Sequence, residues 1–103
     1  MKNEIEKIKE IIVKEYKPEK IILFGSYARG DAKPDSDIDI LVLSDHESNI
    51  LKPKRGLHVR RKLGVIHTPL DILFFTNSEF AKYKNIKQSF NATVMREGIC
   101  IYG

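Results

Sequence analysis

Apolar residues in the first part of the chain recur at helical spacing. They lie three or four positions apart, which places them on one face of a helix. This face consists of Ile5, Ile8, Ile12 and Tyr16. Asn3 and Glu6 have the spacing of a capping box, and Pro18 predicts the end of the helix. The pattern therefore predicts an amphipathic helix at the amino terminus.

Four runs of β-branched, aromatic and other apolar residues predict strands. They cover residues 20–24, 37–42, 70–75 and 99–102. Gly25 and Ser26 follow the first run directly, which is typical of a strand that turns sharply into a short helix. Residues 30–36 are predicted to form a loop. Asp37 and Asp39 alternate with apolar residues in the second run, and Asp71 is the single acid of the third.

Further helices are predicted between and after these strands. Residues 57–63 can form a short helix. Ser78 is expected to cap a longer helix that Gly98 ends. The shared face of that helix would hold Ile86, Phe90 and Val94. The order αβαβαβαβ predicts an α/β domain of the two-layer α+β kind, in which a short mixed sheet carries helices on one side and the three aspartates on the other.

The composition fits one globular domain that covers residues 1–103. Of these residues, 42% are hydrophobic and 31% are charged. The longest apolar run, residues 21–24, is far shorter than the roughly 20 residues of a membrane span. Charges alternate at the amino terminus, where a signal peptide would be apolar, so we expect a cytoplasmic protein with no membrane partner. Cys100 is the only cysteine, which excludes an intrachain disulfide, and we expect it to be a buried apolar residue.

Positive charge is spread along the chain but is densest between residues 52 and 62. The net charge is +4. This basic stretch contains Lys52, Lys54, Arg55, His58, Arg60, Arg61 and Lys62. Such a stretch can bind nucleic acid or an acidic partner, or can simply form a solvated surface. The three histidines and Cys100 do not have the spacing of a zinc site.

Asp37 and Asp39 are predicted to project from the same face of a strand. Side chains two residues apart on a strand point in one direction. Two adjacent carboxylates repel each other unless one is protonated or a cation lies between them, and Mg²⁺ prefers such oxygen ligands. Paired acids also occur on solvated strand faces, but the Gly25–Ser26 turn and Asp71 favour a metal site.

Gly25 and Ser26 stand where a phosphate group could approach the backbone. The start of a helix presents unpaired N–H groups, and glycine leaves room for the ligand. The loop that follows can bring this turn opposite the two aspartates, a geometry that suits phosphoryl or nucleotidyl transfer. Arg29 can either neutralise a triphosphate or cap the short helix.

The segment GSYARGDAKPDSDID resembles the DNA polymerase β superfamily of nucleotidyltransferases. It reproduces a glycine–serine pair, a ten-residue spacer and two aspartates, at Gly25, Ser26, Asp37 and Asp39. The resemblance implies that Asp37 and Asp39 hold both metals. It also implies that Asp71 holds the catalytic metal and helps to deprotonate the acceptor hydroxyl, while Gly25 and Ser26 bind the β- and γ-phosphates.

The length and the ending of the chain, residues 95–102, resemble the minimal nucleotidyltransferases of prokaryotes. This resemblance implies an antitoxin that uses Mg²⁺, as two ions, to transfer AMP from ATP to a tyrosine of a HEPN toxin, a ribonuclease with which it forms a complex. Nucleic acid is not expected as a direct substrate. The interruption at residues 52–56 departs from the family pattern, where a continuous helix is usual.

Two other functions remain open at the level of sequence. The chain can act as a binding antitoxin or scaffold that keeps the acidic site without turnover. It can also transfer a nucleotide to the hydroxyl of a small molecule. An Asp37→Ala variant separates binding from catalysis. If it still neutralises the partner without transferring a nucleotide, binding alone is sufficient.

Overall fold

A four-stranded mixed sheet forms the centre of the protein, with the strands in the order β3-β2-β1-β4. The computed structural model describes residues 2–64, 66, 68–82, 85, 86 and 88–103. The strands are β1 (Lys20–Phe24), β2 (Ile38–Leu43), β3 (Leu70–Phe75) and β4 (Ile99–Tyr102). β1 is antiparallel to β2 and β4, whereas β2 and β3 are parallel. The predicted α+β class with a short mixed sheet is confirmed.

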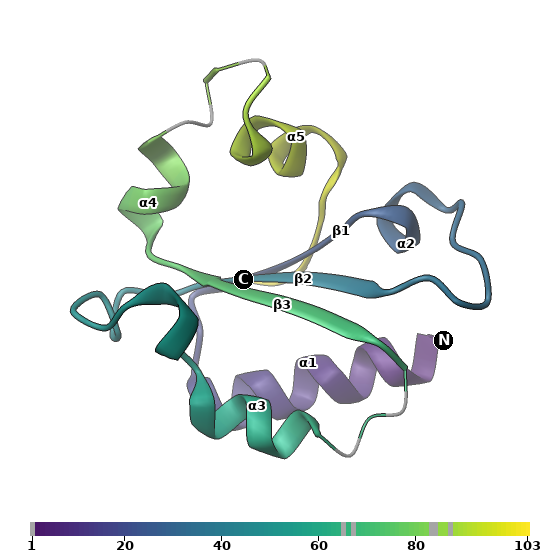
Figure 1. The fold of residues 1–103 in the computed structure, drawn as a ribbon, viewed down its shortest axis with the longest axis horizontal. Coiled ribbons are helices and arrows are strands. Elements are labelled where there is room, and N and C mark those ends of the chain that lie inside the picture. The colour runs from purple at the N-terminus through teal and green to yellow at the C-terminus, as the bar shows by residue number, and fades with distance from the viewer. Residues whose placement is uncertain (1, 65, 67, 83–84, 87) are drawn as a thin grey trace.

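Helices α1 (Lys2–Tyr16) and α3 (Leu57–Leu63) cover one face of this sheet (Figure 1). Ile8 and Ile12 of α1 are completely buried, as the helical spacing predicts, and Val59 of α3 joins them. They pack on alternate residues of β2, among them Ile40. The capping box predicted for α1 involves Asn3, whose side chain lies outside the described part of the structure.

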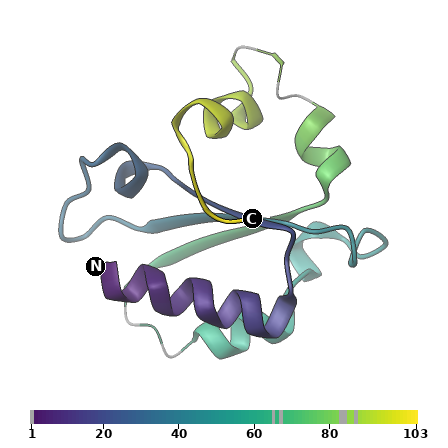
Figure 2. The same ribbon diagram turned by 180° about the vertical axis from the view of Figure 1, so that it is seen from behind.

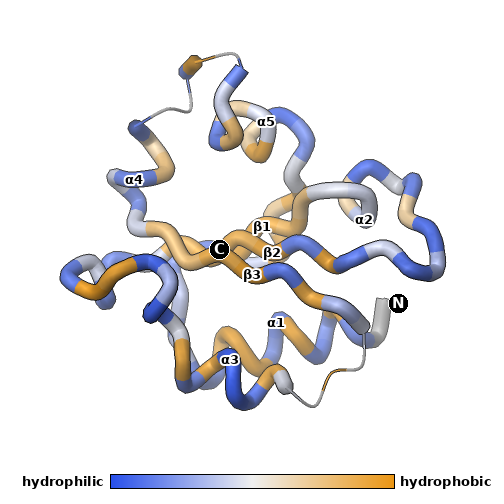
Figure 3. The backbone as a smooth tube through the Cα atoms, in the orientation of Figure 1, coloured by the Kyte–Doolittle hydropathy of each residue, from blue (hydrophilic) through white to orange (hydrophobic). Residues whose placement is uncertain are grey.

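Helices α4 (Asn77–Lys82) and α5 (Phe90–Glu97) lie on the opposite face, as the view from behind also shows (Figure 2). Phe80 and Val94 bury against Leu41 and Leu43 of β2. The prediction that all helices lie on one side was therefore wrong. The physical reason is visible in β2, where the continuous apolar run of residues 40–43 must be covered on both faces (Figure 3).

The single long helix predicted from Ser78 is also wrong, because two separate helices, α4 and α5, occupy this region. Thr76 caps α4, since its Oγ1 accepts from the Glu79 amide while Glu79 accepts from the Thr76 amide. Ser89 caps α5 by accepting from the Ala92 amide at 3.0 Å. Ile86 lies between the two helices and is 54% exposed.

Three smaller features complete the fold. Helix α2 (Ser26–Arg29) follows β1 as predicted, and a 3₁₀ turn, η1 (Lys52–Lys54), stands where Pro53 interrupts the chain. Cys100 is exposed rather than buried, because it lies on the edge strand β4. Within the described residues, no helix is long and apolar enough to cross a membrane.

Candidate active site

The turn from β1 into α2 requires glycine for two reasons. Gly25 has φ 75° and ψ −156°, a conformation that residues with a side chain rarely adopt. A Cβ atom at this position would also overlap with Oδ2 of Asp39. The backbone at the start of α2 therefore lies in direct contact with one of the predicted metal ligands.

Asp39 and Asp71 are direct neighbours on the parallel strands β2 and β3. Their Cα atoms are register partners, and adjacent strands lie about 4.8 Å apart. Both side chains point to the face that α4 and α5 cover further along the sheet, since Leu41 and Leu73, two residues on, pack there. Asp37 lies just before β2, so the prediction that it stands within this strand was wrong. Its side chain is exposed.

The charges of these acids act on one another. Burial raises the pKa of Asp39 above its usual range, and the negative charges of Asp71 and Asp37 raise it further. Arg29 opposes this shift. A carboxylate in such surroundings is stabilised by a proton or by a cation, and the hard oxygen donors of the three aspartates match the preference of Mg²⁺.

The aspartates do not form a closed ligand set. Among the described residues, no three His, Cys, Asp or Glu side chains converge closely enough to hold a metal ion by themselves. Mg²⁺ usually binds through one or two carboxylates together with substrate phosphates and water. The open arrangement of Asp37, Asp39 and Asp71 fits that mode, and their roles as ligands remain predictions.

Arg29 makes two ion pairs at the edge of the site. Its Nε lies 3.2 Å from Asp31, and its guanidinium reaches Glu97 at the end of α5 at 3.5 Å. These two acids therefore hold the Arg29 side chain in a position from which its positive charge still lowers the pKa of Asp39. Sequence reasoning missed Glu97, because no local pattern connects α5 to α2.

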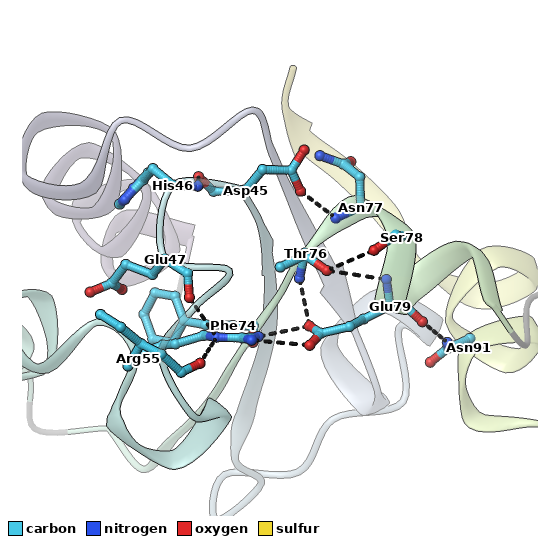
Figure 4. Close-up of polar contacts among 12 residues, drawn as sticks. Asp45, His46, Glu47, Arg55, Phe74, Thr76, Asn77, Ser78, Glu79 and Asn91 are labelled. Carbon is cyan, nitrogen blue, oxygen red and sulfur yellow. Dashed lines mark hydrogen bonds and ion pairs between the residues drawn. The ribbon is translucent and has the colours of Figure 1, made fainter.

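The basic stretch is not a uniform surface, because two of its arginines are part of the fold. Arg55 is 4% exposed and forms a two-bond ion pair with Glu79 at 2.7 and 3.0 Å (Figure 4). Arg60 lies over the ring of Phe74, 5.1 Å from its centre. The basic residues that remain exposed are Lys52, Lys54, His58, Arg61 and Lys62.

Comparison with known families identifies the chain. The family model described as "Polymerase beta, Nucleotidyltransferase" matches residues 6–103. The chain belongs to the polymerase β nucleotidyltransferase family. Its relatives in Methanocaldococcus jannaschii include the "Putative protein adenylyltransferase" MJ0604, which is 40% identical over 83 residues, or 81% of this chain and 77% of that protein. MJ0141, of the same description, is 32% identical over 81% of this chain and 78% of its own length.

Two solved structures show that this nucleotidyltransferase has the fold of its family. One is described as a putative nucleotidyltransferase from Sulfolobus solfataricus, with a TM-score of 0.65 and 21% identity over 95% of this chain and 76% of the other. The second is described as a toxin-antitoxin with AMP-PNP. It has a TM-score of 0.66 and 24% identity over 98% of this chain and 73% of the other. The prediction of a polymerase β-like nucleotidyltransferase fold is confirmed.

Proposed function

We propose that this nucleotidyltransferase transfers AMP from ATP to a hydroxyl group, with Mg²⁺ held by Asp37, Asp39 and Asp71. One observation carries the proposal. The Asp39 carboxylate is paired with Asp71 across β2 and β3, and it also packs against Gly25 at the start of α2. Asp39 and Asp71 therefore lie beside the turn that we propose as the phosphate site, an arrangement that suits nucleotidyl transfer.

Each residue of the site has a defined task in this proposal. The backbone at Gly25, together with Ser26, binds the β- and γ-phosphates through the N–H groups at the start of α2. Arg29 adds positive charge beside them from its position between Asp31 and Glu97. Two Mg²⁺ ions, when bound, supply the charge that neutralises the phosphate oxygens.

The reaction is an exchange of bonds at the α-phosphorus. The acceptor oxygen forms a bond to phosphorus while the bond from phosphorus to the pyrophosphate oxygen breaks, and pyrophosphate leaves. The proton of the acceptor hydroxyl passes to Asp71. Because Asp71 is exposed and lies on the edge strand β3, an acceptor carried on another macromolecule can reach it.

For the acceptor, we infer a tyrosine of a HEPN-type toxin partner. Two findings support a protein acceptor and a toxin partner: the relatives from M. jannaschii are described as putative protein adenylyltransferases, and one structure of the same fold is described as a toxin-antitoxin with AMP-PNP. The tyrosine and the HEPN type come from the resemblance to minimal nucleotidyltransferases. In this proposal the chain is an antitoxin that silences the toxin by modification and forms a complex with it.

Incubation with labelled ATP, Mg²⁺ and the protein encoded beside this chain tests the proposal. We expect label on a tyrosine of that protein, lost in Asp39→Asn and on removal of Mg²⁺ by EDTA. Asp35→Asn removes the same charge from the exposed loop before β2 and should retain activity. A stable complex without label would contradict transfer and favour a binding antitoxin. Label on a small-molecule hydroxyl in place of the partner would contradict the protein acceptor.

A further inference from the structure

A row of aromatic rings leads away from the three aspartates along the same face of the sheet. Phe24 is the register partner of Asp39 on the neighbouring strand β1. The ring of Phe90, on α5, meets Phe24 edge to face with 5.4 Å between ring centres. The ring of Phe75, at the end of β3, follows Phe90, with 6.4 Å between the two ring centres. The row therefore connects the acid cluster to the region beneath α4 and α5.

This row ends at a cavity of about 490 Å³ between α4, α5 and η1. The cavity is lined by Lys52, Phe75, Glu79, Lys82, Phe90 and Asn91. Its size is that of a small-ligand site. The amine of Lys52 lies 4.6 Å from the centre of the Phe75 ring, whereas Phe90 is 46% exposed. Phe24 and Phe75 are partly buried, so Phe90 is the most exposed ring of the row.

Phe90 is held in place by the residues on either side of it. Ser89 caps the first turn of α5. The amide of Asn91, which is 5% exposed, donates to the backbone oxygens of Glu79 and Phe80 at 3.1 and 2.9 Å and thereby fixes α5 against α4 (Figure 4). An aromatic side chain on a fixed backbone is a suitable platform for stacking, because little ordering is needed on binding.

We propose that this cavity binds the base of the nucleotide, which stacks on Phe90. The inference rests on the proposed function, since it assumes that the phosphates bind at Gly25 and Ser26. Those phosphates would lie by α2, at one end of this face, whereas α4 lies at the other end and α5 between them (Figure 1). The cavity is lined by residues of α4 and by the first residues of α5. A nucleotide with its α-phosphate at Asp39 and Asp71 extends its nucleoside along the aromatic row. The flat π-face of Phe90 matches that of a base.

Calorimetric titration of the full chain tests this site with two probes, a non-hydrolysable ATP analogue and inorganic tripolyphosphate, each with Mg²⁺. Loss of base stacking predicts that Phe90→Ala weakens binding of the analogue by roughly 5- to 150-fold. Binding of tripolyphosphate should not change, because that probe has no base. Phe90→Trp should retain the affinity of the wild type for the analogue. Phe90→Leu, which keeps most of the packing, should lose affinity as Phe90→Ala does.

Met95→Ala is the matched control, because Met95 lies on the same helix, is 54% exposed and does not line the cavity. Unchanged binding of the analogue by both Phe90→Ala and Phe90→Leu would overturn the base site, and a raised KM for the acceptor in these variants would assign Phe90 to the acceptor instead. Weaker binding of both probes would also overturn it, by showing a general effect of α5. If the wild type binds neither probe, the proposed function itself fails.

Discussion

Gly25 is the residue at which the phosphate cradle and the carboxylate cluster meet. Its replacement by alanine would place a Cβ atom on the Asp39 carboxylate. We expect Gly25→Ala to lower the rate of AMP transfer on the order of 100-fold, because a displacement of about 1 Å in a catalytic group has effects of that size. Initial rates with labelled ATP provide the measurement.

Gly30 offers a control for backbone strain at the residue scale. It also has a positive φ, of 85°, but no atom lies within 4 Å of the position of its Cβ. Gly30→Ala should lose about 1 kcal/mol of folding stability from its left-handed backbone. Gly25→Ala should lose more, because its conformation is essentially confined to glycine and its Cβ would overlap with Asp39, and only this variant should lose activity. Equal loss of activity in the two variants would mean that strain, and not the contact with Asp39, explains the need for glycine.

At the scale of elements, the pair of Arg55 and Glu79 joins the segment before α3 to α4. Arg55 also donates to the backbone oxygen of Phe74 on β3 (Figure 4). Glu79→Gln should lower the free energy of unfolding by about 2–3 kcal/mol, because it leaves a buried guanidinium without its charged partner. Glu6→Gln is the control, because it removes an exposed ion pair in which the Glu6 carboxylate lies 3.8 Å from the Lys9 amine. It should lower the free energy of unfolding by less than about 1 kcal/mol. Urea unfolding measures both.

The same pair predicts how stability depends on pH. Arg55 lowers the pKa of Glu79 from 4.5 to about 2. The stabilisation is therefore present above about pH 4.5 and is lost as the pH falls towards 2, where Glu79 becomes protonated in the folded state. Unfolding free energies of the wild type and Glu79→Gln should converge over this range. A constant difference between the two would contradict the assignment.

The residues that cap α4 and α5 allow a test of whether this region forms two helices or one. Ser89→Ala should destabilise the protein by about 1 kcal/mol, because the amide of Ala92 loses its acceptor. Ser78→Ala should change stability by less than about 0.5 kcal/mol, since Thr76 caps α4. Thermal unfolding of the two variants distinguishes the observed pair of helices from a single helix that begins at Ser78.

At the scale of the whole molecule, the two layers of helices are unequal. Among the described residues, twelve buried residues form the cluster beneath α1 and α3, and five form the cluster beneath α4 and α5. We expect the amides of α5 to exchange with deuterium faster than those of the central part of α1, because the smaller cluster opens at a lower free energy. Equal protection of the two helices would show that the sheet and both layers open as one unit.

Local patterns determined most of the elements and the types of residue in the candidate site. The first helix, β1, α3, β3 and β4 follow from spacing, β-branched runs and Pro18, because these features act through neighbours in sequence. The chemistry of Gly25, Ser26 and the aspartates is likewise local, since it depends on residue type and on the alternation of side chains along a strand. The polymerase β family could be predicted from those residues alone.

Contacts between distant residues decided what the sequence could not. The break between α4 and α5, the ion pair of Arg29 with Glu97 and the burial of Arg55 each join segments that no short spacing relates. The row from Phe24 to Phe90 and Phe75 exists only because β1, α5 and β3 pack against one another. The sequence by itself therefore determined most of the elements and the reactive groups, because both depend on neighbouring residues. Only the tertiary structure decided which groups meet, because packing of helices on both sides of the sheet sets those distances.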